Sequence, residues 1–371
     1  MIKKIAIILA PNWRDYAERY LADCVRAIRA QDWTGEYKIF LTDNSSTPES
    51  VAFIRQTAPE IDLITNAAND GFCKGNNDAL RRAMQQGFEY FVLLNMDTEV
   101  APDWLRQLVS AADRLNSWGA VQSRLMLFDD KTKINSLGND LHYLGFGFSH
   151  GEGQEWEIRN RKLEIGNSPR FAGEAGGQGE GNNEVTYFSG AAVLLRKDVL
   201  DAVGLFDEEF WMYHEDLDLS WRIRLAGYPL CLAPDSVAYH KYQFAKSIRQ
   251  YYWMERNRAI CLLTLYRWPT ILLIYPMWLV MDAALLLFAI KNGFWWEKIK
   301  ACCWLMLPTT WVYLTKRRQQ IKKLRRVGDR EIVRLFVAEI KFQPVDNWLL
   351  RRVGNPVMRL YWRVVLPLII W

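Results

Sequence analysis

Short apolar runs alternate with longer amphipathic stretches through the first 114 residues of the chain. Residues 5–9 form a continuous apolar run, as in a buried strand, and residues 16–30 place Leu21, Val25 and Ile28 on one face of a helix. Strands alternating with helices of this length predict an α/β fold with a mostly parallel sheet covered on both faces. The same patterns predict further strands at 38–41, 62–64 and 90–94, and helices at 49–56, 75–86 and 104–114.

A glycine-rich segment interrupts this pattern in the middle of the chain. Residues 150–185 include the run GEAGGQGEGNN, which has no periodicity and cannot build a core. A strand at 185–195, a helix at 215–226 and a strand ending at His240 follow it. We therefore interpret 150–185 as a flexible loop within one domain, and a linker between two domains is the alternative.

The long apolar runs of the tail are rich in tryptophan. Residues 270–290 carry one charge in 21 positions, which is enough to cross a bilayer of roughly 30 Å, but Pro276 and Asp282 count against a span. The next apolar run, 301–314, is shorter than the roughly 17 residues that a second crossing needs. We interpret 261–371 as membrane-associating helices that lie in the membrane plane or re-enter it; a hairpin and a buried dimer interface, hence a homo-oligomer, are the alternatives. The tryptophans expected at headgroup depth are Trp295, Trp296, Trp304 and Trp311.

Charge divides the chain into an acidic body and a basic tail. Residues 1–240 carry 24 Lys and Arg against 35 Asp and Glu, whereas residues 241–371 carry 23 against 7. The formal balances are −11 and +16, which sum to the net charge of +5. A basic tail that is also apolar favours an anionic membrane surface over nucleic acid as its partner.

The cysteines and the amino-terminal run indicate a reduced, cytoplasmic chain. Six cysteines show no CxxC pair and no metal-ligand spacing. The start, MIKKIAIILAPNWRD, superficially resembles a signal peptide, but its apolar run is short and meets Arg14 and Asp15 without a small-residue cleavage site. We interpret it as the first strand.

Polar clusters directly follow two of the predicted strands. One is Asp43-Asn44-Ser45 and the other is Asn95-Met96-Asp97-Thr98. Ligands of parallel α/β sheets bind at the carboxyl ends of strands, and Mg²⁺ or Mn²⁺ prefers oxygen ligands completed by substrate phosphates. Asp97 is therefore a candidate metal ligand, and a turn or helix-cap aspartate is the structural alternative.

Three further groups of residues suggest chemistry. Glu215 and Asp216 are adjacent, so that one carboxyl can act as a base while the other positions it, although acids also favour a helix start. His240 can ligate a metal, although a lone histidine is more often structural. A glycine- and amide-rich helix start, residues 69–77, can approach a nucleotide or phosphate through its backbone N–H groups, and a simple glycine loop is the alternative.

In their order along the chain, these motifs resemble one family. The similarity is to the family 2 inverting glycosyltransferases, and it is closest to the rhamnosyltransferase-like branch that builds bacterial surface polysaccharides. It implies a GT-A nucleotide-diphospho-sugar transferase fold, with a mostly parallel Rossmann-like sheet, over residues 1–260, followed by the membrane-associated helical region 261–371. The matching motifs are Asp43-Asn44-Ser45-Ser46, Asn69 through Asn77, LLNMDT, FSGAAVLLRKDVLDAVGLFDEEFWMYHEDLDLSWRIRLAGY and Tyr239-His240.

The resemblance implies a role for each motif. Asp43 would contact the donor base or its ribose, Asp97 is similar to the last acid of the DxD metal motif, and His240 to a histidine that joins the metal site in some members. Asp216 is similar to the catalytic base with Glu215 beside it, and which of the two removes the proton is left open. The other donor-binding residues implied are Asn44, Ser45, Gly71, Phe72, Gly75, Asn76, Asn77 and Asn95, and the acceptor residues are Ser189, Gly190 and Trp211.

The implied reaction is a metal-dependent, inverting transfer that uses Mg²⁺ or Mn²⁺. The donor would be a dTDP-, UDP- or GDP-sugar, with rhamnose as the candidate sugar, and the acceptor a hydroxyl of a glycan or a lipid-linked glycan. The basic, apolar tail would hold the enzyme at the cytoplasmic face of the cell membrane, with peripheral or re-entrant attachment.

Two departures from the family pattern define the alternative function. Asn95 stands where the family has its first metal acid, and Ala10-Pro11-Asn12-Trp13 stands where the first strand usually ends in a Thr-Tyr-Asn type sequence. The alternative is a catalytically inactive, membrane-bound nucleotide-sugar binding module. A nucleotidyltransferase is disfavoured, because residues 8–20 lack a glycine-rich, basic phosphate loop.

Overall fold

The computed structural model describes residues 2, 4–156, 183–241, 250–341 and 348–371, which form two compact units. The first unit contains Met1–Asn139, Ser149–Ile223 and Tyr228–Tyr242, and the second contains Asp140–Phe148, Arg224–Gly227 and Gln243–Trp371. Most of the segment expected to be a flexible loop, residues 157–182 of 150–185, lies outside the described residues.

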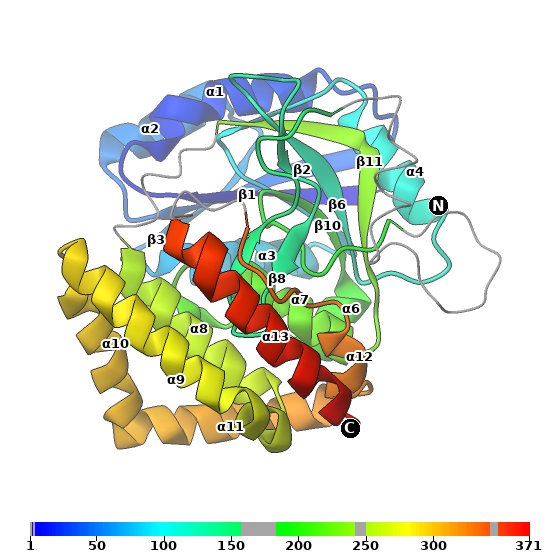
Figure 1. The fold of residues 1–371 in the computed structure, drawn as a ribbon. Coiled ribbons are helices and arrows are strands. Elements are labelled where there is room, and N and C mark those ends of the chain that lie inside the picture. The colour runs from blue at the N-terminus through cyan, green and yellow to red at the C-terminus, as the bar shows by residue number, and fades with distance from the viewer. Residues whose placement is uncertain (1, 3, 157–182, 242–249, 342–347) are drawn as a thin grey trace. The chain divides into compact units, whose positions relative to one another are not determined.

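One twisted sheet organises the first unit (Figure 1). Its order is β3-β2-β1-β4-β10-β6-β11-β5, with β7 paired to β6. Within the described residues, β1, β2, β3, β4, β6 and β11 run in one direction, whereas β5, β7 and β10 are antiparallel to their neighbours. The strands are β1 Lys4–Asn12, β2 Glu36–Asn44, β3 Asp62–Asn66, β4 Tyr90–Leu94, β5 Thr98–Val100, β6 Ala120–Leu127, β7 Ile134–Ser136, β10 Ala192–Arg196 and β11 Leu230–His240.

Helices cover this sheet as the sequence predicts. In α1 the predicted apolar residues Leu21, Val25 and Ile28 are fully buried. In α2, Pro48 occupies the first turn and the Thr47 hydroxyl caps the helix by accepting from the Ser50 N–H at 3.2 Å. The helices are α1 Tyr16–Arg29, α2 Pro48–Thr57, α3 Gly71–Gln85, α4 Trp104–Asp113, α6 Lys197–Val203 and α7 Glu215–Leu225.

Two predicted boundaries are wrong. Helix α3 begins at Gly71 and not at residue 75, because Gly71 adopts φ +84° and allows the chain to enter the helix one turn earlier. The strand expected at 185–195 is regular only from Ala192, because the residues before it make isolated bridges and turns. Both corrected segments belong to the candidate site.

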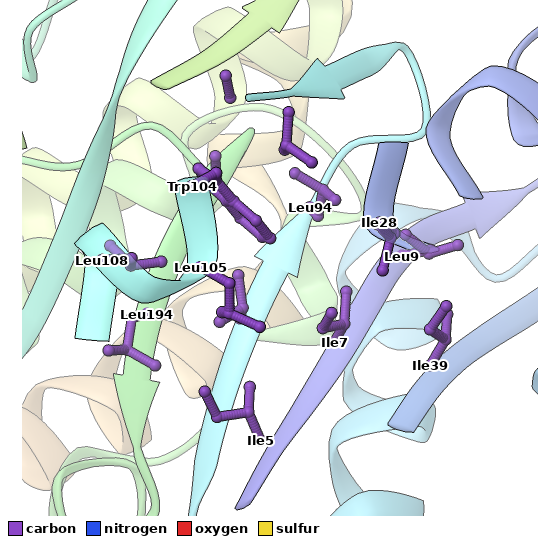
Figure 2. Close-up of a cluster of buried hydrophobic side chains, with 14 of the residues drawn as sticks. Ile5, Ile7, Leu9, Ile28, Ile39, Leu94, Trp104, Leu105, Leu108 and Leu194 are labelled. Atoms are coloured by element: carbon purple, nitrogen blue, oxygen red, sulfur yellow. The ribbon is translucent and has the colours of Figure 1, made fainter. Parts of the chain in front are cut away.

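The core cluster lies between the sheet and helices α1, α2 and α4. Figure 2 shows Ile5, Ile7 and Leu9 of β1 pointing toward the same cluster as Leu94 of β4 and Trp104 of α4. Alternate residues of a strand face opposite sides, so β1 supplies this cluster with every second side chain. Trp104 is fully buried, and its ring N–H donates to the Ser123 hydroxyl at 2.8 Å. This packing fixes the strand ends on which the polar clusters lie.

The second unit is mostly helical. Its helix α9 is long and apolar enough to cross a membrane, with a mean hydropathy of 2.2, which by itself is weak evidence for a span. The apolar run 301–314 does not form one helix, because α10 ends at Met306 and α11 begins at Pro308. The helices are α8 Tyr251–Leu265, α9 Trp268–Lys291, α10 Trp295–Met306, α11 Pro308–Leu324, α12 Asp329–Val333 and α13 Asn355–Val365, and β8 Asn139–Leu141 pairs with β9 Gly147–Ser149.

Candidate active site

The predicted site residues meet at one edge of the sheet. The parallel strands β1, β2, β4 and β11 all end there, which brings Asp43, Asp97 and His240 to the same side. Strand β10 is antiparallel and therefore begins at this edge, so Ser189 and Gly190 arrive there too. The Asn95 N–H donates to the Ala191 carbonyl at 2.9 Å and joins the two segments.

Asp43 lies in a buried hydrogen-bond cage at the end of β2. Only 2% of the residue is exposed. The Asn12 amide donates to its Oδ1 at 2.7 Å, and the N–H of Ser46 donates to its Oδ2 at 3.1 Å. The Ser46 hydroxyl also donates to Oδ1. These hydrogen bonds from Asn12 and Ser46 hold the Asp43 carboxylate in one orientation. A ligand that contacts Asp43 would therefore meet a carboxylate that is already positioned.

Asn44 and Ser45 continue this strand end into a tight turn. The Asn44 amide donates to the Gly71 carbonyl at 2.9 Å, and its Oδ1 accepts from Asn66 at 3.1 Å. Ser45 adopts φ +57°, the left-handed region that few non-glycine residues occupy. The turn therefore ties the end of β2 to the start of α3.

Close backbone packing holds the start of α3. The Gly75 carbonyl accepts from the Thr42 hydroxyl at 2.7 Å, and a Cβ on Gly75 would lie 2.4 Å from Pro11 Cγ. Asn77 is fully buried, donating to the Phe206 carbonyl at 2.9 Å and accepting from its N–H at 3.1 Å. Gly75 and Asn77 are thus structural in this geometry.

The two residues Phe72 and Asn76 lie one helical turn apart on α3. The Asn76 amide donates to the Phe72 carbonyl at 2.9 Å, and Asn76 is 1% exposed. The ring of Phe72 packs edge-on against Phe206 at 6.3 Å between centroids. Both residues therefore brace the helix start, whose backbone is the part that can approach a nucleotide.

Trp211 forms a strained turn against this helix start. Its φ of 61° and ψ of −59°, with the Met212 N–H donating to the Phe210 carbonyl at 2.6 Å, define a classic γ-turn. The Trp211 carbonyl accepts from the Cys73 N–H at 3.1 Å. Tyr213 and His214 also have positive φ, so three of the four residues before Glu215 lie in a costly backbone region. Such strain concentrates at sites where a fold must aim particular side chains.

Gly71→Ala tests this packing, because a Cβ at Gly71 would lie 2.5 Å from Trp211 Cδ1. We expect a loss of about 1–3 kcal/mol of stability and lower affinity for the nucleotide ligand that the motifs predict, because the tryptophan is displaced. Thermal unfolding and ligand titration measure the two effects. Gly87→Ala is the matched control, since Gly87 has a similar φ of +79° but nothing within 4 Å of the added Cβ. Equal effects of the two substitutions would show that the Trp211 contact is unimportant.

Asp97 and His240 form a pair where β4 and β11 end. Asp97 Oδ1 lies 3.3 Å from His240 Nε2, and both side chains are largely buried. Burial raises the pKa of Asp97, but the adjacent His240 ring and the Tyr16 hydroxyl outweigh it, so its pKa lies below the usual value. His240 Nδ1 lies 2.9 Å from Asn135 Oδ1; an amide oxygen only accepts, so Nδ1 carries the proton and Nε2 faces Asp97.

The residues at this point fit a divalent cation. Asn95 Oδ1 and Asp97 Oδ1 are buried acceptor atoms that receive no hydrogen bond from any residue the structure describes. Unsatisfied buried oxygens are uncommon and suit a ligand or ion. No group of three His, Cys, Asp or Glu side chains with metal-binding geometry occurs among the described residues. A cation held here would therefore need oxygens from a substrate, as diphosphates supply.

Glu215 and Asp216 begin α7 as a partly buried acid pair. Asp216 Oδ1 accepts from the Leu217 N–H at 2.7 Å, and the Gly190 N–H also bonds this carboxylate. Burial raises the pKa of Asp216, and burial together with the charge of Asp216 raises the pKa of Glu215 further. Glu215 Oε2 is a third buried acceptor without a partner among the described residues. Raised pKa values are what a general base at neutral pH requires.

Ser189 and Gly190 connect the acid pair to the sheet. The Ser189 N–H donates to the fully buried Gln122 Oε1 at 2.7 Å, and the Ser189 hydroxyl accepts from the Ala191 N–H at 3.3 Å. A Cβ on Gly190 would lie 3.9 Å from Asp216 Cβ. The predicted acceptor segment and the predicted base are therefore neighbours.

Comparisons with known proteins identify the family. The model of glycosyl transferase family 2 matches residues 8–204, more than half of the 371 residues. The chain belongs to glycosyl transferase family 2. It is a glycosyltransferase of the predicted GT-A α/β type.

Two relatives of this glycosyltransferase are named for rhamnose transfer and for O-antigen biosynthesis. It is 24% identical over 254 residues to the N-acetylglucosaminyl-diphospho-decaprenol L-rhamnosyltransferase of Mycobacterium tuberculosis, covering 64% of this chain and 75% of the relative. It is 29% identical over 242 residues to the O-antigen biosynthesis protein RfbC of Myxococcus xanthus, covering 64% of this chain but 17% of the relative. The prediction of a rhamnosyltransferase-like member is thereby confirmed.

Solved structures of similar proteins are more distant. One is Staphylococcus aureus TarS 1-349 in complex with UDP, at 14% identity and a TM-score of 0.49, covering 98% of this chain and 90% of that one. Another is the mannosyltransferase PcManGT from Pyrobaculum calidifontis in complex with GDP-Man and Mn²⁺, at 17% identity and a TM-score of 0.47, covering 87% and 86%.

The structure adds residues to the candidate site that sequence reasoning missed. Asn12 orients Asp43, Tyr16 bonds Asp97, and Asn135 holds His240. Arg222, 4% exposed, donates to the carbonyls of residues 203–205 and to Asp218. Asp218 is thus structural, because it is paired with Arg222 inside the protein. No sequence motif points to Tyr16 or Asn135, because Tyr16 lies far in sequence from Asp97 and Asn135 lies far from His240.

Glu215→Gln should stabilise the glycosyltransferase at alkaline pH. The folded-state pKa of Glu215 is raised, so the folded protein binds more protons than the unfolded chain, and stability falls as pH rises toward the folded pKa. Glutamine removes this loss, and we expect the melting temperature to rise by about 2 °C or more at pH 8. Thermal unfolding at pH 5 and 8 measures it. The exposed Glu89 provides a control, since Glu89→Gln should leave the pH dependence unchanged.

Proposed function

We propose that this glycosyltransferase transfers a sugar from a nucleotide-diphosphate donor to an acceptor hydroxyl, with inversion and with a divalent cation. The observation that carries the proposal is the convergence of two partly buried acid sites at one sheet edge. Asp97 with His240 lies at one, and Asp216 with Glu215 lies at the other. Asn95, Ala191 and Gly190 link them by short backbone contacts.

The acid pair supplies the base. Asp216 removes the proton from the acceptor hydroxyl as the oxygen attacks the anomeric carbon from the face opposite the diphosphate. The bond between that carbon and the diphosphate oxygen breaks, the nucleoside diphosphate leaves with the electron pair, and the proton stays on the carboxyl. One displacement inverts the anomeric centre. Burial, which raises the pKa of Asp216, strengthens it as a base near neutral pH.

Asp97 and His240 are the residues that would hold Mg²⁺ or Mn²⁺, with Asn95 Oδ1 beside them. A bound cation would neutralise the negative charge that develops on the leaving diphosphate, which stabilises the transition state by several kcal/mol. The chain itself orients the two ligands through Tyr16 and Asn135. Asp97 is the one acid that this motif offers, which agrees with a cation held partly by the substrate.

The donor and acceptor are proposed from the relatives. The name of the mycobacterial relative gives L-rhamnose as the sugar and N-acetylglucosaminyl-diphospho-decaprenol as the acceptor. We propose rhamnose as the sugar, carried by dTDP, UDP or GDP, and a glycan or lipid-linked acceptor in cell-surface polysaccharide synthesis. Such an acceptor places the enzyme at the cytoplasmic face of the cell membrane, where attachment raises its effective concentration. The Asp43 cage and the Gly71–Asn77 segment are the proposed donor-binding elements.

A donor screen tests the proposal. The full chain is incubated with dTDP-, UDP- and GDP-sugars and Mg²⁺ or Mn²⁺, and release of the nucleoside diphosphate and thermal stabilisation are both measured. We expect one donor to stabilise the protein and to be consumed only with the cation. Stabilisation without turnover in the presence of polyprenyl-diphosphate acceptors would instead support the inactive binding module.

A further inference from the structure

The second unit exposes nearly all of the large apolar side chains that the described residues leave at the surface. Of 22 such side chains, every one except Trp13 lies between Trp268 and Ile370. Large exposed apolar surfaces are rare on proteins that work free in water, and they mark interaction sites. The second unit therefore carries the surface that a partner would cover.

Helix α9 is apolar on two faces. Ile271, Ile274 and Met277 are buried among the other helices of the unit. Leu272, 70% exposed, and Leu287, 68% exposed, are on the other side with Leu279 between them. These positions recur every seven or eight residues and so form one stripe along a helix about 36 Å long.

Helix α13 carries a second stripe of the same kind. Val357, Leu360 and Val364 are exposed at helical spacing, whereas Met358 and Trp362 are buried. The two helices are neighbours: the Tyr361 hydroxyl donates to the Leu273 carbonyl at 2.6 Å, and Figure 1 shows α13 beside α9. We refer to the stripes of these neighbouring helices together as the apolar face, defined by Leu272, Leu279, Leu287, Val357, Leu360 and Val364.

Positive charge borders the α13 stripe. Arg352, Arg359 and Arg363 each precede an exposed apolar residue by one position, and all three are exposed. Residues 241–371 as a whole carry 23 basic against 7 acidic side chains. Two copies of this face would bring like charges together, whereas an anionic surface complements them. Exposed Trp268, Trp295 and Trp296 are of the type that settles at headgroup depth.

A buried ion cluster holds α9 within the unit. Its Asp282 accepts from Arg258 at 2.6 Å and lies 3.2 Å from Lys298, and both cations also pair with Glu255. The side chains of Arg258, Lys298 and Glu255 are 5% exposed or less. Burial opposes ionisation of Glu255, yet the two cations outweigh it and lower its pKa to about 2. Withdrawing Asp282 would leave buried charge uncompensated, which is strongly unfavourable.

We propose that the apolar face of α9 and α13 docks in the plane of an anionic lipid bilayer, with the bordering arginines on its headgroups. The inference deepens the proposed membrane location and is independent of catalysis. Membrane binding is therefore measured without a sugar donor, and donor hydrolysis in solution is measured separately. Failure of one experiment leaves the other interpretable.

The test is sedimentation of the full chain with vesicles of phosphatidylcholine alone or with phosphatidylglycerol. We expect binding to the anionic vesicles that weakens with salt. Leu279→Gln with Leu360→Gln should weaken it roughly tenfold per leucine, and Arg352→Gln with Arg363→Gln roughly fivefold per arginine. Arg55→Gln with Arg114→Gln, which removes two exposed charges from the first unit, should leave binding unchanged. Alkaline carbonate should release the bound protein.

Three results would overturn the proposal. Equal affinity for neutral and anionic vesicles would reject the charge argument. Retention after carbonate treatment would show that α9 spans the bilayer. Absence of vesicle binding, with a dimer that the leucine substitutions dissociate, would assign the face to a second copy of the chain. The melting curve of each variant shows whether it is folded. If the double leucine variant does not fold, the single substitution Leu279→Gln is used in its place.

Discussion

Asp216→Asn should lower the rate of sugar transfer by about 10² to 10⁴-fold while the donor still binds. Asparagine keeps the size of the side chain and can still accept the hydrogen bonds from the Leu217 and Gly190 N–H groups, but it cannot take a proton. The measurement is kcat for transfer together with calorimetric binding of the donor. Because the pKa of Asp216 is raised by burial, wild-type activity should fall, as pH is lowered, at a higher pH than an ordinary aspartate would give.

The control for this variant is Asp113→Asn. Asp113 is exposed at the end of α4, so the substitution removes one negative charge outside the site. Glu215→Gln completes the comparison, since the two acids are adjacent and titrate as a pair. Full activity in Asp216→Asn, with loss in Glu215→Gln, would move the base to Glu215. Full activity in both Asp216→Asn and Glu215→Gln would reject the proposed role of the acid pair.

Asp97→Ala should abolish cation-dependent binding of the nucleoside diphosphate. The substitution removes the one carboxylate that the strand-end motif offers and leaves His240 and Asn95, neither of which carries a negative charge. We expect at least a 100-fold loss of affinity in the presence of Mg²⁺ or Mn²⁺, beyond the 10- to 100-fold that loss of a supporting residue causes. Calorimetry with and without the cation separates this effect from contacts to the base.

Two further variants make the Asp97 result specific. Asp97→Asn preserves the shape of the site and should lose most of the same affinity, because the negative charge is gone. Tyr16→Phe removes only a supporting hydrogen bond and should cost about 10-fold. Cation-dependent affinity that is unchanged in Asp97→Ala, in a variant that melts normally, would reject Asp97 as a metal ligand.

Asp97 also shows what a sequence can suggest about a site. Its position after an apolar run predicted a strand-end carboxylate, and β4 is found at the predicted residues 90–94. The same local pattern fits a turn aspartate equally well. The pairing with His240, 143 positions away in sequence, and the unsatisfied oxygen of Asn95 appear only when β4 and β11 end at one edge. These contacts support the metal proposal and are set by strand order.

Asp282 shows the same limit in the tail. By composition it counted against a membrane span, because a charge in an apolar helix is costly in lipid. The structure adds a contact that the composition does not contain: Arg258 and Lys298, from α8 and α10, pair with Asp282. Sequence spacing contains no information on that pairing.

The alternation of strands and helices, the polar clusters at strand ends and the order of motifs that places the chain in its family were all predictable from the sequence. These features depend on the periodicity of side chains within one element, which neighbours in sequence create. Three features required the folded chain: the antiparallel direction of β10, which delivers Gly190 to Asp216; the tight turn of Trp211 against Gly71; and the structural role of Asn77. Such contacts join residues tens to more than a hundred positions apart. They are decided by which strands pair and which surfaces pack, because each local segment alone is compatible with several partners.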